Sequence, residues 1–286
     1  MNHVVQLIEK SSAFEDVVEC VRGGQGLPCS VFGVTQNAKA YFVAAVQDAA
    51  KKQVVCITST EQSAQDLAGA VDGLFFPDNE IELRDVTARG RQSELARIGV
   101  LKKAGKTKEP VFLSARAFIT RMMPQTAFVR ACINLMQGGK YDVFKLLAQF
   151  VQNGYERVGT VYSKGEFAMR GEILDIYPAD SKKPLRVTFF DDEIESIRAF
   201  ECETQKSYKK QIERYTLPPA REVVLDEQAR EKMLAYLKDT DTKTNDISAP
   251  YQKGEMYSAF KILGTDSNKI YVWMLKYEYL GQGKEP

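Results

Sequence analysis

The sequence predicts an α/β protein in which a parallel α/β domain is followed by an antiparallel α+β module. Through about the first 130 residues, short apolar runs alternate with amphipathic helical segments. Beyond residue 153, strand-like runs follow one another with only short turns between them. Alternating strands and helices are typical of a parallel sheet, whereas consecutive strands joined by tight turns are typical of an antiparallel meander.

Length and composition exclude several classes of protein. The 286 residues are enough for two domains, and 44% hydrophobic with 27% charged residues is the mix of a globular chain. A net charge of +1 disfavours bulk electrostatic binding to nucleic acid. The apolar runs are much shorter than the roughly 20 residues that span a bilayer, and the N-terminus lacks the pattern of a signal peptide, so we expect no membrane association.

The cysteines and the single histidine limit the chemistry. Five widely spaced cysteines without a CxxC pair indicate reduced thiols and a cytoplasmic protein: Cys20, Cys29, Cys56, Cys132 and Cys202. His3 is the only histidine, which argues against Ser-His-Asp, Cys-His and histidine-based zinc catalysis. We therefore expect no metal, no cofactor and no catalytic residue.

The elements of the first domain follow from their apolar spacing. Leu27–Gly33 is predicted to be a strand, Asn37–Lys51 a helix and Gln53–Ser59 a buried parallel strand. Three more elements are predicted further along: helices over Glu61–Val71 and Gln92–Ala104, and a strand over Pro110–Ser114 followed by a helix that ends by Pro124.

The second module begins with a helix that Asp142 caps and Asn153-Gly154 ends. Four strands are predicted after it, with a turn at Asp191-Asp192: Tyr155–Tyr162, Glu166–Tyr177, Leu185–Phe190 and Glu193–Phe200. Pro218-Pro219 marks a boundary, and Asp226 opens another helix. Two strand-like runs, Met256–Leu263 and Lys269–Tyr279, lie in the last segment.

A degenerate nucleotide-binding loop lies between the first predicted strand and helix. In the frame GxxxxGK[ST], Gly33 and Lys39 are present. Ala38 replaces the second glycine, and Ala40 replaces the hydroxyl residue that would hold magnesium. The segment therefore favours a decayed loop over a working ATP site.

A more informative pattern lies on the strand 185–190. Because side chains alternate between the faces of a strand, Leu185, Val187 and Phe189 are expected in the core, and Arg186 and Phe190 on the outer face. Arg170, on the preceding strand, is expected near them. Arginine with an aromatic residue is typical of protein-interface anchors. The alternative, which the pattern leaves open, is that another domain covers Phe190 while the arginines form surface ion pairs.

Two other functions are alternatives. One is a P-loop ATPase or helicase fragment that uses Lys39. The other is a nucleic-acid-binding module that uses the cluster Arg84, Arg89, Arg91 and Arg97. Acidic residues interleave with that cluster, which favours a solvated helix and loop.

Several ordered motifs resemble one family. They are Gly165-Glu166-Phe167-Ala168-Met169-Arg170-Gly171, then Pro184-Leu185-Arg186-Val187-Thr188-Phe189-Phe190-Asp191-Asp192-Glu193, then Thr204-Gln205-Lys206-Ser207. Together they are similar to the N-terminal UvrB-homology region of the bacterial transcription-repair coupling factors. The resemblance covers about residues 1–240. It leaves 251–286 as an unmatched β-rich tail.

The resemblance implies a non-catalytic adaptor. Residues 1–130 would be a degenerate P-loop-type α/β domain, interrupted by a UvrB-domain-2-like module at 131–217, with a return segment at 218–250. The module would recruit UvrA through positions that fall on Arg170, Arg186 and Phe190. The full-length family is an ATP-dependent DNA translocase, which binds RNA polymerase and DNA through domains absent here.

Overall fold

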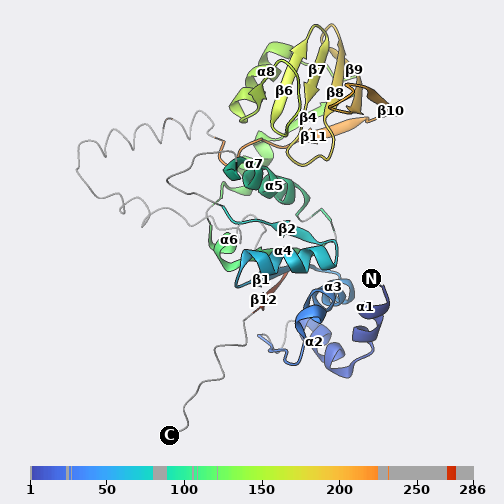
Figure 1. The fold of residues 1–286 in the computed structure, drawn as a ribbon, viewed down its shortest axis with the longest axis vertical. Helices are drawn as coiled ribbons and strands as arrows, with labels where there is room; N and C mark the ends of the chain where they lie inside the picture. Colours follow the sequence, from blue (N-terminus) through green and yellow to red (C-terminus); the bar gives the residue numbers. More distant parts are fainter. Residues whose placement is uncertain are drawn as a thin grey trace, which may run out of the picture. The chain divides into compact units, whose positions relative to one another are not determined.

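A computed structural model of the chain describes residues 2–23, 26, 28–79, 89–104, 106–107, 109–120, 122–224, 231 and 269–274. The chain divides into two compact units (Figure 1). Unit 1 comprises Met1–Thr120 with Ala259–Pro286, and unit 2 comprises Arg121–Ser258. The fold is mixed α/β, with a parallel sheet in unit 1 and a mainly antiparallel sheet in unit 2.

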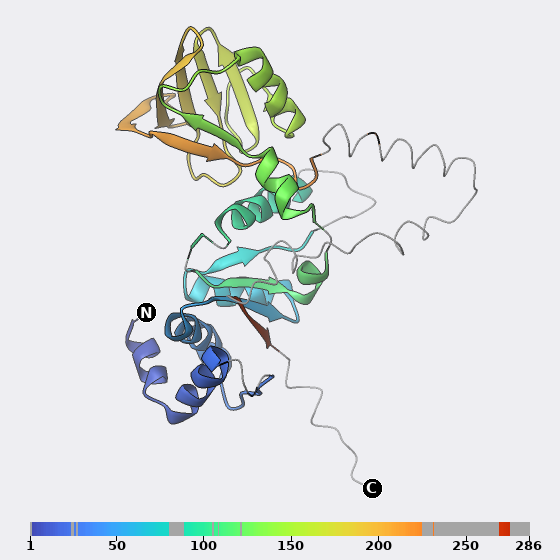
Figure 2. The ribbon, with the colours of Figure 1, turned by 180° about the vertical axis from the view of Figure 1, so that it is seen from behind.

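Unit 1 is built on a parallel sheet of four strands in the order β12-β1-β3-β2. The strands are β1 (Gln53–Thr58), β2 (Leu74–Phe76), β3 (Val111–Ser114) and β12 (Lys269–Met274). Strand β12 lies beside β1 although more than 200 residues separate them in sequence (Figure 2). The expectation of a parallel sheet for this part of the chain is confirmed. The predicted strand Met256–Leu263 and the predicted helix from Asp226 lie outside the described residues, apart from the helical residue Glu231.

Helices surround this sheet. They are α1 (Asn2–Glu9), α2 (Ser12–Gly23), η1 (Gln36–Ala38), α3 (Lys39–Ala50), α4 (Glu61–Ala70), α5 (Arg89–Lys103) and α6 (Ala115–Ile119). Side chains cap the starts of α4 and α6: the Thr60 hydroxyl accepts a hydrogen bond from the amide of Ser63, and the Ser114 hydroxyl accepts one from the amide of Ala117. The core joins Val43 of α3 to β1 and β3.

The predicted strand at Leu27–Gly33 is wrong. The described residues 28–33 lie outside the sheet, and the Phe32 side chain is exposed. The two edges of β1 pair with β3 and β12, so no place beside β1 remains for a strand from this segment. The strand that pairs with β1 on the side away from β3 is thus β12, which lies more than 200 residues further along the chain.

Unit 2 contains a six-stranded sheet in the order β10-β9-β8-β7-β6-β5. Its strands are β5 (Glu156–Arg157), β6 (Glu166–Arg170), β7 (Ile173–Ile176), β8 (Leu185–Phe190), β9 (Glu193–Phe200) and β10 (Ser207–Gln211). The predicted strand Glu166–Tyr177 is instead the hairpin β6–β7, which turns at Gly171 with φ of +59°. Of the predicted strand Tyr155–Tyr162 only β5 forms, and β5 pairs with β6 in parallel.

One face of this sheet carries the core of unit 2. The helix α8 (Val143–Gln152) packs Leu146 and Phe150 inward, and the Phe150 and Phe167 rings lie 5.4 Å apart. Asp142 caps α8 by accepting the amide of Lys145, as predicted. Val151, which follows Phe150 on α8, is exposed.

The remaining elements of unit 2 are helix α7 (Gln125–Ala131) and the antiparallel pair β4 (Ile133–Met136) and β11 (Arg214–Leu217). Within the described part of the chain, no helix has the length and apolar character needed to cross a membrane.

The five cysteines are free, and their environments differ. Cys29 is exposed, whereas Cys56 on β1 is buried, and burial raises the pKa of its thiol to about 12. Because the thiolate is the reactive form, Cys56 is protected both by burial and by its pKa.

We predict that iodoacetamide at pH 8 modifies Cys29 in the native protein and leaves Cys56 unmodified. Cys56 is expected to react after urea unfolding, since its thiol then regains an ordinary pKa. Peptide mass spectrometry of the two samples measures both. Modification of native Cys56 at the rate of Cys29 would contradict the buried position of β1.

Candidate functional site

The outer face of the six-stranded sheet, opposite α8, aligns two rows of side chains across neighbouring strands. The first row joins Ala168, Asp175, Arg186 and Arg198, each opposite the next. The second row joins Arg170, Ile173, Thr188 and Ser196. Phe190 lies two residues beyond Thr188 on the same strand. Strand alternation therefore brings Arg170, Arg186 and Phe190 to one face.

Asp175 is the centre of a buried ionic cluster on this face. Its side chain is 0% exposed. Arg186 donates from Nε to Oδ1 at 2.7 Å and from Nη2 to Oδ2 at 2.9 Å, and Arg170 donates from Nη2 to Oδ2 at 2.8 Å. The hydrogen bond with Asp175 raises the pKa of the Arg186 guanidinium. A buried carboxylate is costly unless it is paired, so both cations stabilise Asp175.

Arg186 is held from a second side as well. Its Nη1 donates to the carbonyl of Gln205 at 2.9 Å, and its Nη2 lies 3.3 Å from the Gln205 Oε1. The guanidinium carbon lies 4.6 Å from the centroid of the Phe200 ring, a cation–π distance. The Arg186 side chain is accordingly only 18% exposed. Most of its donors are used within the chain.

Arg170 differs from Arg186. Its side chain is 49% exposed, and among the described residues its one hydrogen bond runs from Nη2 to Asp175. Its other N–H groups are available to a partner. Ile173, opposite Arg170 on β7, is itself 37% exposed. A cation and an apolar side chain thus lie side by side at the accessible end of the face.

Phe190 projects from a well-anchored turn. Its side chain is 74% exposed. The turn that follows has Asp191 at φ of +57°, and the amide of Tyr141 donates to the carbonyl of Asp192 at 2.8 Å. The amide of Ile194 donates to the carbonyl of Gly139 at 3.0 Å, and Lys140 pairs with Asp192. These contacts fix the backbone that presents the Phe190 ring.

Three residues of this face were not predicted from the sequence. Asp175, Ile173 and Gln205 were not singled out, although a carboxylate inside the apolar run Ile173-Leu174-Asp175-Ile176 is a signal that a cation lies opposite. Gln205 offered a weaker signal, as a member of the Thr204–Ser207 motif.

The segment Gly33–Ala40, predicted to be a degenerate nucleotide-binding loop, uses two of its amides within the chain. Gly33 has φ of +81°, and the chain then enters η1. The amides of Ala38 and Lys39 both donate to the carbonyl of Thr35, at 3.0 and 3.2 Å. In a phosphate-binding loop such amides point at the phosphate.

The space beside this loop is mainly apolar. A hollow of about 340 Å³ is lined by Gly33 and Ala38 together with the rings of Phe14, Phe32 and Phe42. Ala40, at the position of the magnesium-binding hydroxyl, is buried. None of the side chains that line this hollow is charged.

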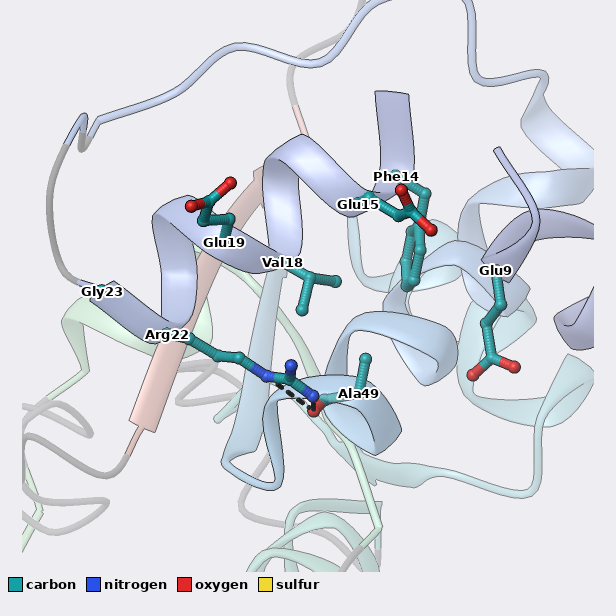
Figure 3. A pocket seen from close by; sticks show the side chains of 8 residues that line it. All are labelled: Glu9, Phe14, Glu15, Val18, Glu19, Arg22, Gly23 and Ala49. Atoms are coloured by element: carbon teal, nitrogen blue, oxygen red, sulfur yellow. Dashed lines mark hydrogen bonds between the residues drawn. The ribbon is translucent and has the colours of Figure 1, made fainter. Parts of the chain in front are cut away.

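A larger hollow, of about 560 Å³, lies between α2 and the end of α3 (Figure 3). Arg22 reaches across it and donates from Nε to the carbonyl of Ala49 at 3.2 Å. Phe14 and Val18 form its apolar wall. The described residues contain no group of three or more potential metal ligands here or elsewhere.

Arg97, one of the four arginines of the nucleic-acid alternative, does not lie on the surface. Arg97 is fully buried, donates from Nη1 to the carbonyl of Pro77 at 2.8 Å, and lies 4.2 Å from the Phe76 ring centroid. Arg84 and the side chain of Arg89 lie outside the described residues. For Arg97, the favoured expectation of a solvated side chain is wrong, and so is the alternative of a phosphate contact, because the side chain is part of the core.

The geometry predicts unequal structural roles for the two arginines. Arg186→Ala leaves the buried Asp175 with one cation, and we expect a loss of about 3–5 kcal/mol of stability in unit 2. Arg170→Ala removes a half-exposed cation, and we expect a loss of about 1 kcal/mol or less. Hydrogen exchange of the β7 and β8 amides measures both. Equal losses in the two variants would contradict the arrangement.

The sequence is similar to a known domain family and to several known proteins. Residues 133–223 match the family described as the UvrB interaction domain. The chain is 28% identical over 241 residues to the transcription-repair-coupling factor of Bacillus subtilis, covering 80% of this chain and 20% of that protein. It is 29% identical over 232 residues to that of Myxococcus xanthus, covering 76% and 19%.

A third relative extends the match. The transcription-repair-coupling factor of Staphylococcus aureus strain Mu50 is 28% identical over 273 residues, which is 92% of this chain and 23% of that protein. Residues 251–286 make up more than a tenth of the chain, so the alignment includes part of this tail, which the sequence analysis expected to be unmatched.

The chain spans about a fifth of the length of the curated relatives it matches. The matched UvrB interaction domain contains the whole outer face described above. The chain is therefore similar to the N-terminal region of the bacterial transcription-repair-coupling factors, and its residues 133–223 match the UvrB interaction domain.

Proposed function

We propose that this chain is a non-catalytic adaptor region that binds UvrA through the outer face of unit 2. The observation that carries the proposal is that the matched UvrB interaction domain holds an exposed aromatic ring and an arginine with available donors on one rigid face. Such residues are the usual anchors of protein interfaces.

Within this face we assign different roles to the residues. Arg170 donates to a carboxylate of the partner, and Phe190 enters an apolar pocket, with Ile173 extending the apolar contact. Arg186 supports the face from beneath, because most of its donors are bonded within the chain. A fixed backbone lowers the entropy lost on association, so the anchored turn at Asp191-Asp192 favours tight binding.

We further propose that unit 1 is a P-loop-type domain that no longer binds nucleotide. The support is chemical: Ala38 and Ala40 replace the residues of a working loop, and the Thr35 carbonyl accepts the amides that a phosphate would need. The alternative of an ATPase fragment using Lys39 would require this segment to rearrange.

In a longer protein of the kind that these relatives represent, the adaptor would bring UvrA to stalled RNA polymerase. Contacts with the polymerase and with DNA, and ATP-driven translocation, would belong to regions beyond this chain. We propose 131–217 as the UvrB-domain-2-like binding module, 1–130 as the degenerate domain, 218–250 as the return segment and 251–286 as a β-rich tail. Such a protein acts in the bacterial cytoplasm.

The first test is calorimetric titration of the chain with purified UvrA. Phe190→Ala is expected to weaken binding by about 2 kcal/mol or more, roughly 30-fold, since an interface anchor is lost. Phe144→Ala is the matched control, because Phe144 is 87% exposed on α8, which covers the opposite face. Equal affinity of wild type and Phe190→Ala would remove Phe190 from the interface.

Nucleotide binding is tested by thermal unfolding. ATP with magnesium is expected to leave the unfolding midpoint unchanged, because a ligand raises it only by binding the folded state. A rise that Lys39→Ala abolishes would support the ATPase alternative instead.

A further inference from the structure

The turn between β9 and β10 contains a backbone conformation that needs an explanation. Gln205 is a non-glycine residue with φ of +58°. Its amide donates to the carbonyl of Glu201 at 2.8 Å, and its side-chain Nε2 donates to the carbonyl of Cys202 at 2.7 Å. A side chain in this left-handed region is unfavourable and persists where the surroundings require it.

The conformation directs both acceptors of Gln205 at one cation. Its backbone carbonyl accepts from Arg186 Nη1 at 2.9 Å, and its Oε1 lies 3.3 Å from Arg186 Nη2. The same guanidinium meets the two oxygens of Asp175 on its other edge. Gln205 and Asp175 thus clamp Arg186 between a turn and a strand.

We propose that Gln205 is a positioning residue for the partner-binding face, acting by holding the Arg186 guanidinium in one orientation. The held cation fixes the carboxylate of Asp175, and that carboxylate orients Arg170 through its bond to Nη2. Gln205 therefore sets the direction in which Arg170 presents its remaining donors. The inference rests on the proposed function, since the face is taken to bind UvrA.

The proposal also assigns a role to the Thr204-Gln205-Lys206-Ser207 motif. Thr204 stabilises the turn locally, because its hydroxyl donates to Glu201 Oε2 at 3.1 Å. Gln205 is the member of the motif that reaches Arg186. A residue in the same turn with no bond to Arg186 is thereby available as a control.

The test compares three variants with the wild-type chain. Gln205→Gly removes the side chain while keeping a residue that adopts the positive φ without strain. Thr204→Ala removes a hydroxyl of the same turn. Arg186→Lys keeps the positive charge and removes the planar fork. Each single variant is titrated with UvrA, and so is the double variant Gln205→Gly/Arg186→Lys.

We expect Gln205→Gly to weaken UvrA binding about 3- to 10-fold, the range for losing the preorganisation of one side chain. In the Arg186→Lys background, Gln205→Gly is expected to change the affinity less than twofold, because its effect depends on the Arg186 guanidinium, which lysine lacks. Thr204→Ala is expected to bind as the wild type. An equal loss in both backgrounds, or no loss from Gln205→Gly, would overturn the proposal.

A second readout does not depend on UvrA. In the wild-type chain the Arg186 Nη signals are expected to be resolved in nitrogen-15 NMR spectra, because their rotation is restrained, and to merge by exchange in Gln205→Gly. If the wild type fails to bind UvrA while the Nη signals still respond to Gln205→Gly, the proposed function fails and the clamp stands. If the signals are the same in both proteins, the clamp itself is refuted.

Discussion

The outer face of unit 2 depends on one buried negative charge. Asp175 lies in the middle of a sheet with no access to solvent, and two guanidinium groups are its counterions. A carboxylate in that position is tolerated only while it is paired, so the strands that carry Asp175, Arg170 and Arg186 must keep their register. The ionic cluster therefore determines the geometry of the face as much as it stabilises it.

The residues of this face differ in how much of each side chain is exposed to solvent. Arg186 lies over Phe200 and is bonded on both edges, whereas Arg170 has one bond and half of its surface in solvent. Phe190 is more exposed than either and stands on an anchored turn. Loss of function in an Arg186 variant would thus combine a stability effect with any binding effect, and Arg170 and Phe190 are the cleaner probes.

In unit 1, the spacing of Gly33 and Lys39 is similar to that of a phosphate-binding loop, but the local backbone geometry does not support such a site. The Lys39 of the loop remains at the start of α3, but a carbonyl of the chain satisfies the amides beside it. Beside β1, the edge that a preceding strand would occupy is filled by β12. A lysine at this spacing is not by itself evidence of a phosphate site when the amides of Ala38 and Lys39 are already bonded within the chain.

Local pattern by itself determined most of the elements and the faces of the strands. The alternation along 185–190 predicted which side chains are buried, because a strand has a period of two. Asp142 predicted the start of α8, because a short carboxylate caps free amides. The ordered motifs around Arg170, Arg186 and Phe190 indicated the family.

Only the tertiary structure decided which edge a strand takes and which charges are neutralised. The apolar pattern of a run such as 28–33 does not determine whether the run joins the sheet. A strand from a distant part of the sequence, here β12, can occupy the same edge of β1 instead. The pairing of Arg186 with Asp175 and Gln205 likewise depends on strand register and on a turn with positive φ, which no local spacing encodes. Sequence thus specified which side chains share a face, and long-range pairing specified which of them remain available to a partner.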